Sequence, residues 1–477
     1  MARFDSVVVG GTLVVPDVGE LRADVGIKDG RIASIAQDLG PGDGDEAIDA
    51  RGKYVFPGGV DSHYHLGIYR DITDDTETET TSSLVGGVTT VISYFRTGSH
   101  YLNKSGPYRE IFPEVLGRVE GHAKVDYAFH LAPMTAEHVR EIPWLADEMG
   151  VTSFKYYMFY KGLNLSADSR DAKAYTMAEE YDLGHLFEIM EAVAAVDRRS
   201  PGRVSLSLHC EQAELLRVFI ERAKADPTVS GLAEYAAARP PLTERLSIEE
   251  AGVLADHTRV PVNLLHLSSE LALDTATGVV RRYGLDANLE TTVHHLALAH
   301  DDLQGLGGKV NPPIRTRADN EALWRGLIDG RVGTVASDHA CCMEESKGTD
   351  LWPALPGFGG TALLYPVLIS EGHHKRGVPL ARIASVASAT PARIFGLAPR
   401  KGTIAVGSDA DLAIVDLDLE QVVTPELCLS AQDHTPFAGV TVRGWPVATL
   451  VRGIPMFRDG EAAKDHVGSY LSRGGVH

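Results

Sequence analysis

The chain has little cysteine and no long hydrophobic run. Its four cysteines are too few for a disulfide framework in 477 residues, which favours a reducing compartment. No apolar run approaches the ~20 residues that span a bilayer. The first residues also lack the basic stretch and apolar stretch of a signal peptide. We therefore expect a cytoplasmic protein without a membrane partner.

Positive charge is scarce as well. The sequence has 45 lysines and arginines against 65 aspartates and glutamates, a formal net charge of −20. Such a surface repels nucleic acid and anionic membranes, so we expect neither as a partner. The 44% hydrophobic and 23% charged residues are typical of a globular protein.

Both ends of the chain have the alternating pattern of short β-strands. Residues 5–56 contain several such stretches, and the turn Lys28-Asp29-Gly30 predicts a hairpin. The same pattern returns after residue 401. We predict one small sheet domain assembled from residues 1–56 and 401–477.

The middle of the chain, residues 57–400, alternates short apolar stretches with longer stretches compatible with helix. One helix candidate, residues 247–258, opens with the Ser-x-x-Glu pattern of a capping box. Alternating strands and helices predict a parallel sheet, and a count of eight favours a (β/α)8 barrel over an open sheet. The eight candidate strands lie within residues 54–63, 87–95, 125–133, 150–160, 203–210, 260–269, 286–296 and 333–340.

Residues able to bind metal recur at these strands. In a barrel, active-site residues lie at the carboxyl ends of the strands. Alternation along a strand places two residues of a His-x-His pair on the same side, so both imidazoles can reach one ion. Imidazole and carboxylate together suit Zn²⁺ and related metals. The residues are His63 and His65 at the first strand, Lys155 in the fourth, His209 and His266 at the fifth and sixth, and Asp338 at the eighth.

Each of these residues has an ordinary structural explanation when it is taken alone. A single histidine after an apolar run is most often a core residue, and Asp338 could cap a turn. Lys155 lies among aromatic residues, where a charged ammonium is costly. A lysine that has reacted with CO2 would instead carry a carbamate able to bridge two metals, which chemistry allows but does not demand. The joint pattern favours a shared metal site.

At this point the sequence resembles the amidohydrolase superfamily, and within it the dihydropyrimidinase, hydantoinase and allantoinase branch. The resemblance covers almost the whole chain and implies a barrel accompanied by a composite β-sandwich. The matching segments are FPGGVDSHYH (56–65), GGVTTVI (86–92), TSFKYYMFYKG (152–162), LHCEQ (208–212), LLHLSS (264–269), NPPIR (311–315), SDHA (337–340) and KGTIAVGSDADLAIVDLD (401–418).

The resemblance implies two divalent metal ions, most often Zn²⁺, with Mn²⁺ and Co²⁺ as alternatives. His63 and His65 would hold one ion together with Asp338, and His209 and His266 the other. The N6-carboxylated side chain of Lys155 would bridge the two. A hydroxide shared by the ions would attack the substrate.

The resemblance also implies the remaining roles. Asp338 would move the proton from the nucleophile to the departing ring nitrogen. Tyr160 would support the developing oxyanion through its hydroxyl. Thr291 and Gly357 match positions whose backbone contacts the substrate ring. The implied reaction opens a cyclic amide or ureide, such as a hydantoin or dihydropyrimidine, to an N-carbamoyl amino acid.

Several departures from the family pattern concern the substrate. The seventh-strand segment reads Glu-Thr-Thr-Val-His-His (290–295), the loop 355–360 reads Leu-Pro-Gly-Phe-Gly-Gly, and adjacent cysteines at 341–342 suggest packing residues. The loops 66–75, 96–105 and 156–162 would shape the pocket. Their aromatic residues would favour an apolar substituent, whereas Arg70 or Arg96 facing inward would favour a carboxylate or ureido group.

Three other functions remain open on the sequence. Allantoinase or another cyclic-amide hydrolase would use the same metals. A catalytically inactive scaffold would have lost ligands, although all six positions are present. A deaminase with one metal would lack the bridging lysine. Related enzymes imply a homo-oligomer, either a homotetramer or a dimer.

Overall fold

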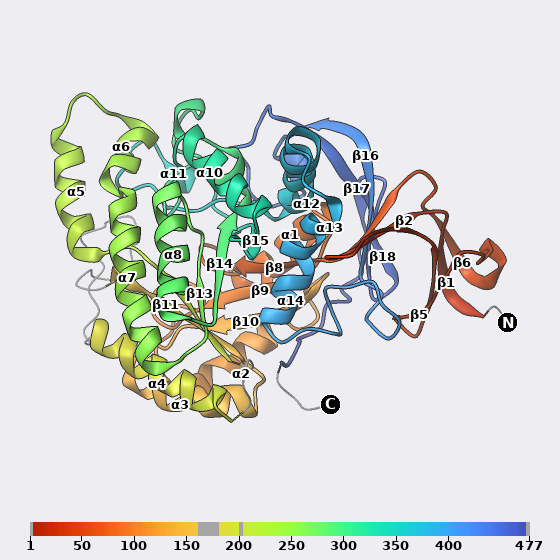
Figure 1. Cartoon of the computed structure of the whole chain (residues 1–477), viewed down its shortest axis with the longest axis horizontal. Helices are drawn as coiled ribbons and strands as arrows, with labels where there is room; N and C mark the ends of the chain where they lie inside the picture. Colours follow the sequence, from red (N-terminus) through yellow and green to blue (C-terminus); the bar gives the residue numbers. More distant parts are fainter. Residues whose placement is uncertain (1–2, 161–180, 200–203, 474–477) are drawn as a thin grey trace.

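The barrel is formed by one sheet of eight parallel strands in sequence order (Figure 1). The computed structural model describes residues 3–160, 181–199 and 204–473. Each barrel strand overlaps one of the eight predicted stretches. The strands are β8 (Gly59–Tyr64), β9 (Val88–Phe95), β10 (Asp126–Leu131), β11 (Ser153–Tyr157), β12 (Ser205–His209), β13 (Val262–Leu264), β14 (Ala287–Thr292) and β15 (Thr334–Ala336).

The barrel closes between β8 and the segment after β15. A parallel bridge joins Tyr64 to His339, and the N–H of His65 donates to the carbonyl of His339 at 2.8 Å. This seam lies at the carboxyl ends of the two strands, so it brings His63 and His65 next to Asp338.

The first predicted strand divides in two at Gly58. β7 (Tyr54–Pro57) pairs with strands of a different sheet, and β8 begins the barrel at Gly59. A Cβ atom at Gly58 would lie 2.1 Å from Oγ1 of Thr89, so only glycine fits this crossing between the sheets. The hydrophobic pattern is continuous across residue 58 and did not reveal the break.

Helices surround the barrel strands (Figure 1). The prediction that a helix begins at Ser247 was wrong, because α7 begins at Pro241 with Pro240 as its N-cap and Ser247 is buried inside it. The helices are α1 (Ile72–Val85), α2 (Tyr108–Val119), α3 (Ala136–Asp147), α4 (Leu183–Asp197), α5 (Ala213–Ala225), α6 (Gly231–Ala238), α7 (Pro241–Thr258), α8 (Glu270–Tyr283), α9 (Val293–Ala297), α10 (Arg317–Ile328), α11 (Glu344–Lys347), α12 (Leu364–Val367), α13 (Leu380–Ala384) and α14 (Thr390–Ile394).

Two further sheets pack beside the barrel (Figure 1). A seven-stranded sheet, in the order β19-β18-β17-β16-β7-β2-β3, combines strands from both ends of the chain, and a four-stranded sheet has the order β5-β4-β1-β6. Their strands are β1 (Phe4–Val9), β2 (Thr12–Val15), β3 (Gly19–Arg22), β4 (Asp24–Lys28), β5 (Arg31–Ala36), β6 (Gly44–Asp49), β16 (Leu412–Val422), β17 (Thr441–Val451), β18 (Ile454–Arg458) and β19 (Glu461–Ala462).

The hairpin between β4 and β5 is present as predicted. Its turn places Asp29 at φ 50° and Gly30 at φ 73°, the left-handed values that a two-residue hairpin turn requires. Buried side chains of both sheets, among them Val25, Ile32 and Leu450, form one apolar cluster between them. The prediction of a TIM barrel with a β-sandwich is therefore confirmed.

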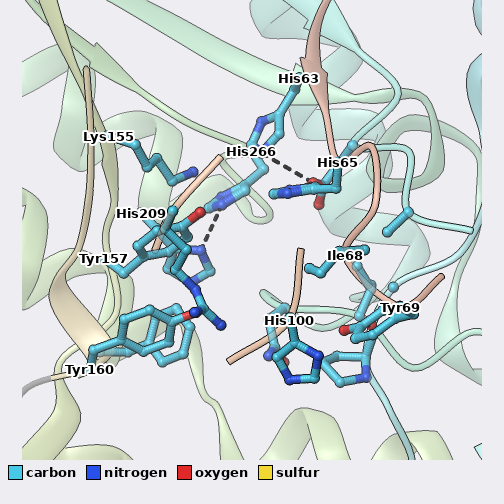
Figure 2. Close-up of a pocket in the computed structure, with 18 residues that line it drawn as sticks. His63, His65, Ile68, Tyr69, His100, Lys155, Tyr157, Tyr160, His209 and His266 are labelled. Carbon is cyan, nitrogen blue, oxygen red and sulfur yellow. Dashed lines mark hydrogen bonds and ion pairs between the residues drawn. The ribbon is translucent and has the colours of Figure 1, made fainter. Parts of the chain in front are cut away.

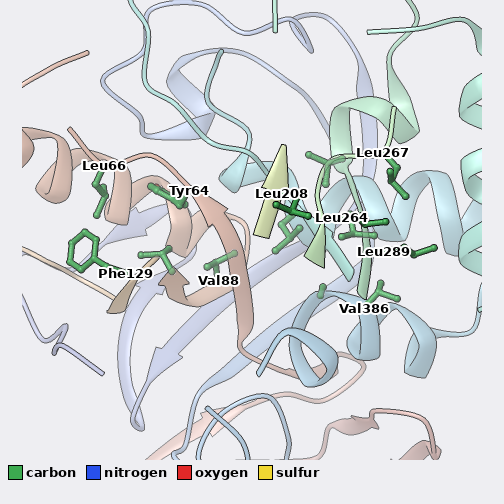
Figure 3. Close-up of a cluster of buried hydrophobic side chains, with 14 of the residues drawn as sticks. Tyr64, Leu66, Val88, Phe129, Leu208, Leu264, Leu267, Leu289 and Val386 are labelled. Atoms are coloured by element: carbon green, nitrogen blue, oxygen red, sulfur yellow. The ribbon is translucent and has the colours of Figure 1, made fainter. Parts of the chain in front are cut away.

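A close-packed apolar layer lies on the face of the barrel strands opposite to the polar site residues. Leu208, Leu264 and Leu289 stand in register on the adjacent strands β12, β13 and β14 (Figure 3). All three are at most 6% exposed, so their burial stabilises the strands that carry the polar residues above them. Across the described parts of the chain, no helix has the length and apolar character to cross a membrane.

Candidate active site

His63, His65 and Asp338 converge at the closing seam of the barrel. Nε2 of His63 lies 3.1 Å and Nε2 of His65 lies 3.2 Å from the same oxygen of Asp338. The potential ligand atoms of the three residues all lie within 4.8 Å of one another. This group has the composition and closeness of a divalent-metal site.

His209 and His266 form a second pair beside the first group. Nδ1 of His209 lies 2.9 Å from Nε2 of His266, and the rings of His63 and His266 are 5.3 Å apart. His266 has φ 36° and Asp338 has φ 52°, left-handed values that are uncommon for residues other than glycine. Such backbone strain often occurs at functional sites, where the surrounding structure maintains it.

Two buried carboxylates that the sequence analysis did not assign fix the orientation of these histidines. Glu290 lies 2.7 Å from Nδ1 of His63, and Glu211 lies 2.7 Å from Nε2 of His209. In each neutral imidazole that donates to its carboxylate, the other nitrogen keeps a lone pair directed into the site. Ligand histidines often have such a partner, so the acidic residues close to the strand ends were the signal available in the sequence.

Lys155 lies on β11 among aromatic rings. Its Nζ is 4.2 Å from the ring centre of Tyr94 and 4.9 Å from that of Tyr157, and the residue is 1% exposed. Among the described residues, none accepts a hydrogen bond from Nζ or forms an ion pair with it. Burial lowers the pKa of Lys155 to about 7, so a large fraction of the amine is uncharged at neutral pH.

Burial also keeps the ligand imidazoles uncharged. It lowers the pKa of His63 to about 3 and the pKa values of His65 and His209 to about 4. Burial alone would raise the pKa of the Asp338 carboxyl, but the neighbouring imidazoles of His63 and His65 outweigh it and hold that pKa below its usual range. The site therefore offers neutral nitrogen donors and an anionic oxygen, the forms that bind a cation.

All six predicted ligands line a single cavity (Figure 2). Figure 2 shows the four histidines and Lys155 at one end, with Tyr157 and Tyr160 on one side and Ile68, Tyr69 and His100 on the other. The remaining lining residues are Arg96, Phe159, Val310, Asn311, Asp338, Ala340, Pro356 and Gly357.

The predicted substrate contacts differ in position. Tyr160 and Gly357 line the cavity, whereas Thr291 does not, and its hydroxyl donates to the carbonyl of Leu267. The N–H of Gly357 donates to the carbonyl of Lys309, and its own carbonyl accepts from Nζ of Lys347. Asn311 lines the cavity instead, with its Oδ1 accepting from the hydroxyl of Tyr235 at 2.5 Å. Sequence reasoning missed this residue, although NPPIR was among the matching segments.

The departures from the family pattern are mostly buried packing residues. His294 is fully buried, its ring lies 5.0 Å from that of Phe358, and neither ring nitrogen has a hydrogen-bond partner among the described residues. Cys341 and Cys342 are buried and not bonded to each other. Of the loop 156–162, residues 161 and 162 lie outside the described parts of the chain.

The site suits a cation on the evidence of its own donors. When Glu290 accepts from Nδ1 of His63, Nε2 presents a lone pair to an anionic oxygen of Asp338 only 3.1 Å away. Two acceptors at this distance repel each other unless a proton or metal lies between them. Nδ1 of His266 is buried without a partner, and the nearby Lys155 amine has none among the described residues. These features fit a metal-dependent site.

Comparison with known proteins gives a consistent result. The sequence profile of the amidohydrolase family matches residues 274–456. A D-hydantoinase of Geobacillus stearothermophilus is 32% identical over 97% of this chain and 95% of its own length. An allantoinase of Rubrobacter xylanophilus is 31% identical over 99% and 98%. The solved structure of an L-hydantoinase (dihydropyrimidinase) from Arthrobacter aurescens superimposes with a TM-score of 0.87 at 30% identity, over 98% of this chain and 100% of that one.

Proposed function

Because this chain belongs to the hydantoinase and allantoinase branch of the amidohydrolase family, we propose that it hydrolyses a cyclic amide or imide of the hydantoin or dihydropyrimidine type. Water adds across one ring amide, the C–N bond breaks, and the product is an N-carbamoyl amino acid. The convergence of six ligand-type residues in one cavity at the carboxyl end of the barrel is the observation that carries this proposal.

We propose two divalent ions, most often Zn²⁺ with Mn²⁺ or Co²⁺ as alternatives, in this cavity. His63, His65 and Asp338 would hold one ion, His209 and His266 the other, and N6-carboxylated Lys155 would join the two. When bound, such ions polarise a carbonyl and generate a nucleophile from water at neutral pH. The buried amine of Lys155, which has no hydrogen-bond or ion-pair partner among the described residues, supports its carboxylation.

Asp338 is the proposed proton carrier. It is the one carboxylate among the described residues that line the cavity, and its lowered pKa means that it is ionised before the reaction. It would take the proton of the attacking water and deliver it to the ring nitrogen as the C–N bond breaks. Its left-handed backbone, held by the seam to His63, fixes the carboxylate in place.

Tyr160 would stabilise the carbonyl oxygen as negative charge develops on it. Its ring stacks on Tyr157 at 4.7 Å and meets Phe159 edge-on at 4.5 Å, so the side chain has little freedom. A rigid hydroxyl at the cavity wall stabilises charge in the transition state without reorganising. The carbonyl of Gly357 and the side chain of Asn311 are candidates for contacts to the ring amides, and Thr291 stays a prediction from the family pattern.

A substrate panel tests the proposal. Purified protein would be assayed with 5-substituted hydantoins, dihydrouracil and allantoin, with and without added Zn²⁺, Mn²⁺ or Co²⁺. We expect metal-dependent opening of a hydantoin or dihydropyrimidine, followed by release of the N-carbamoyl product. Failure to open any cyclic amide under all metal conditions would refute the proposal.

Allantoinase activity is the second candidate. Allantoinases of four bacterial species align with at least 96% of this chain at 29–31% identity, as extensively as the D-hydantoinases do. Rapid opening of allantoin without turnover of hydantoins or dihydrouracil would favour it. A scaffold without catalysis is disfavoured because all six ligand residues share one cavity.

Three further proposals concern the assembly, the location and the domain limits of the protein. We propose a homotetramer or dimer, which light scattering coupled to gel filtration would measure. We propose a cytoplasmic location, in keeping with four cysteines that form no disulfide. We also propose domain limits at residues 1–56 with 401–477 for the sandwich and 57–400 for the barrel, which limited proteolysis would locate.

A further inference from the structure

Arg96 is a buried guanidinium in the wall of the active-site cavity. It follows the carboxyl end of β9, is 3% exposed, and lines the same cavity as the metal-type ligands. The sequence left two arginines, Arg70 and Arg96, as candidates for facing the substrate. Only Arg96 is among the residues that line this cavity.

Among the described residues, Arg96 has no carboxylate partner, unlike other arginines near the site. Arg70 pairs with Asp75 at 3.0 Å, and Arg239 donates from Nε to Glu211 at 3.0 Å. Within residues 3–160, 181–199 and 204–473, no ion pair is formed by Arg96. A buried charge without a counter-ion is costly, which indicates that an anion is provided by something other than the described protein.

The hydrogen bonds of Arg96 to the backbone go to neutral carbonyl groups. Nη1 donates to the carbonyls of Ser99 at 2.7 Å and Thr97 at 3.3 Å. The guanidinium also lies 5.8 Å from the ring centres of Tyr101 and Tyr160. These contacts hold the group rigidly between two aromatic rings without neutralising its charge.

The loop that follows Arg96 contains several residues with strained, left-handed backbone angles. His100, Tyr101 and Asn103 have φ values of 70°, 55° and 52°, all in the left-handed region. The loop is closed by a bridge in which the N–H of Gly98 donates to the carbonyl of Lys104 at 2.6 Å. Three non-glycine residues in this conformation within four positions indicate a preorganised binding surface rather than a simple connection.

The charges of the cavity indicate that an anion bound to Arg96 would lie away from the predicted metal ligands. Asp338 is the only carboxylate among its described lining residues, and it contacts His63 and His65 at the metal end. Arg96 instead contacts Tyr160, which Figure 2 shows below the histidines on one side wall. An anion paired with Arg96 would therefore belong to a substituent of the substrate ring and not to the amide that is hydrolysed.

We propose that the substrate is a cyclic amide whose ring carries a carboxylate substituent, which forms an ion pair with Arg96. The inference rests on the function proposed above and narrows it to anionic hydantoins or dihydropyrimidines. The planar guanidinium suits this role because it can bind a carboxylate through two parallel hydrogen bonds. Arg96 is then a residue that determines specificity and takes no part in the chemical step.

Two nearly isosteric substrates test the proposal: 5-carboxymethylhydantoin and its carboxamide, 5-carbamoylmethylhydantoin. The wild type should have the higher kcat/KM for the carboxylate. Arg96→Met should lower this value about 100-fold or more, since it removes one partner of a buried charge pair, and change the carboxamide value less than about threefold. Arg96→Lys should restore part of the preference for the carboxylate. Arg70→Met is the matched control, since it removes a nearby guanidinium outside the cavity, and should leave the ratio of the two values unchanged.

The outcomes separate recognition from indirect effects. Equal losses on both substrates in a folded, metal-loaded Arg96→Met protein would mean that Arg96 acts through Tyr160 or the loop, and would overturn the proposal. A wild type that prefers the carboxamide would overturn it as well. If neither compound is hydrolysed, calorimetric titration of zinc-loaded wild type distinguishes the failures. If the carboxylate compound binds more tightly than the carboxamide, only the proposed reaction is contradicted. If the two compounds bind equally, the role of Arg96 is contradicted.

Discussion

Two buried polar clusters of this molecule contrast sharply. One gathers His63, His65 and Asp338 at the carboxyl end of the barrel, and the other gathers Asp126, Asp409 and Asp411 where the barrel meets the seven-stranded sheet. Both bring three potential metal-binding atoms within 4.8 Å of one another. The difference lies in their counter-ions.

The aspartate cluster contains its own cation. Nζ of Lys401 lies 2.5 Å from Asp126, 2.6 Å from Asp411 and 2.9 Å from Asp409, and Arg452 also pairs with Asp126. The nearest lysine of the histidine cluster, Lys155, has no ion pair among the described residues. Proximity of ligand atoms alone therefore does not identify a metal site. A cluster that lacks a protein cation is the stronger candidate.

The largest effect is expected at Asp338. Asp338→Asn keeps the size of the side chain but removes the charge and the ability to accept a proton, so kcat/KM should fall about 10⁴-fold. Steady-state assays on the preferred hydantoin would measure this, and circular dichroism would confirm that the fold is retained. Activity within tenfold of wild type would contradict the role of Asp338.

The aspartate cluster should respond in stability and not in activity. Lys401→Met removes the cation shared by the three buried carboxylates, although Asp126 keeps Arg452 and Asp409 keeps Arg400. It should reduce the free energy of unfolding by about 3–5 kcal/mol, chiefly through the buried carboxylate of Asp411. The stability lost in Lys401→Met should grow as pH rises above about 4. Burial raises the folded pKa of Asp411, so an unpaired charge on this carboxyl costs stability once the unfolded chain ionises.

Chemical denaturation at several pH values would measure the effect of Lys401→Met. The control is Lys375→Met, which removes an exposed lysine paired with Glu371 and should cost less than about 0.5 kcal/mol. The aspartate cluster is expected to have a structural role only. Binding of additional metal by Lys401→Met, or a loss of activity per folded molecule, would contradict this.

Tyr160 should affect the chemical step. Tyr160→Phe removes only the hydroxyl and should reduce kcat about 100- to 1000-fold, the usual effect of losing one oxyanion donor. Tyr156→Phe is a matched control, since the hydroxyl of Tyr156 donates to the carbonyl of Asp182 and does not line the cavity. Equal kcat values for the two variants would exclude the proposed role of Tyr160.

The smallest effect is expected at Glu211, which orients His209 without lining the cavity. Glu211→Gln should weaken metal affinity about 10- to 100-fold, because the imidazole loses its carboxylate partner. Competition with a chromophoric chelator would measure the change. Glu250→Gln removes a carboxylate that bonds the side chain of Gln212 and should leave metal affinity unaltered.

The sequence predicted the barrel well because its signals are local and repeated. Each strand is a short apolar run, and the residues at its end follow from that run, as at His209 and Asp338. The break at Gly58 was missed because it depends on the contact with Thr89, a residue of another strand. Periodicity cannot reveal a restriction that comes from a distant part of the chain.

The sequence predicted the candidate metal ligands, but it did not predict the residues that orient them or that line the rest of the cavity. Glu290 and Glu211 orient the histidines through tertiary contacts, and Arg96 differs from Arg70 only in which side chain lines the cavity. Side-chain direction in a loop depends on packing, which the order of residues does not encode locally. Thr291 illustrates the same limit, since its hydroxyl bonds the carbonyl of Leu267 and the residue does not line the cavity.

We propose that the active-site cavity holds two divalent ions joined by Lys155. Metal analysis of protein purified with zinc and bicarbonate tests it most directly, with the variant Lys155→Met prepared in parallel. We predict two equivalents per wild-type chain and clearly fewer in the variant. Less than one equivalent in the wild type, or equal content in both proteins, would contradict the account.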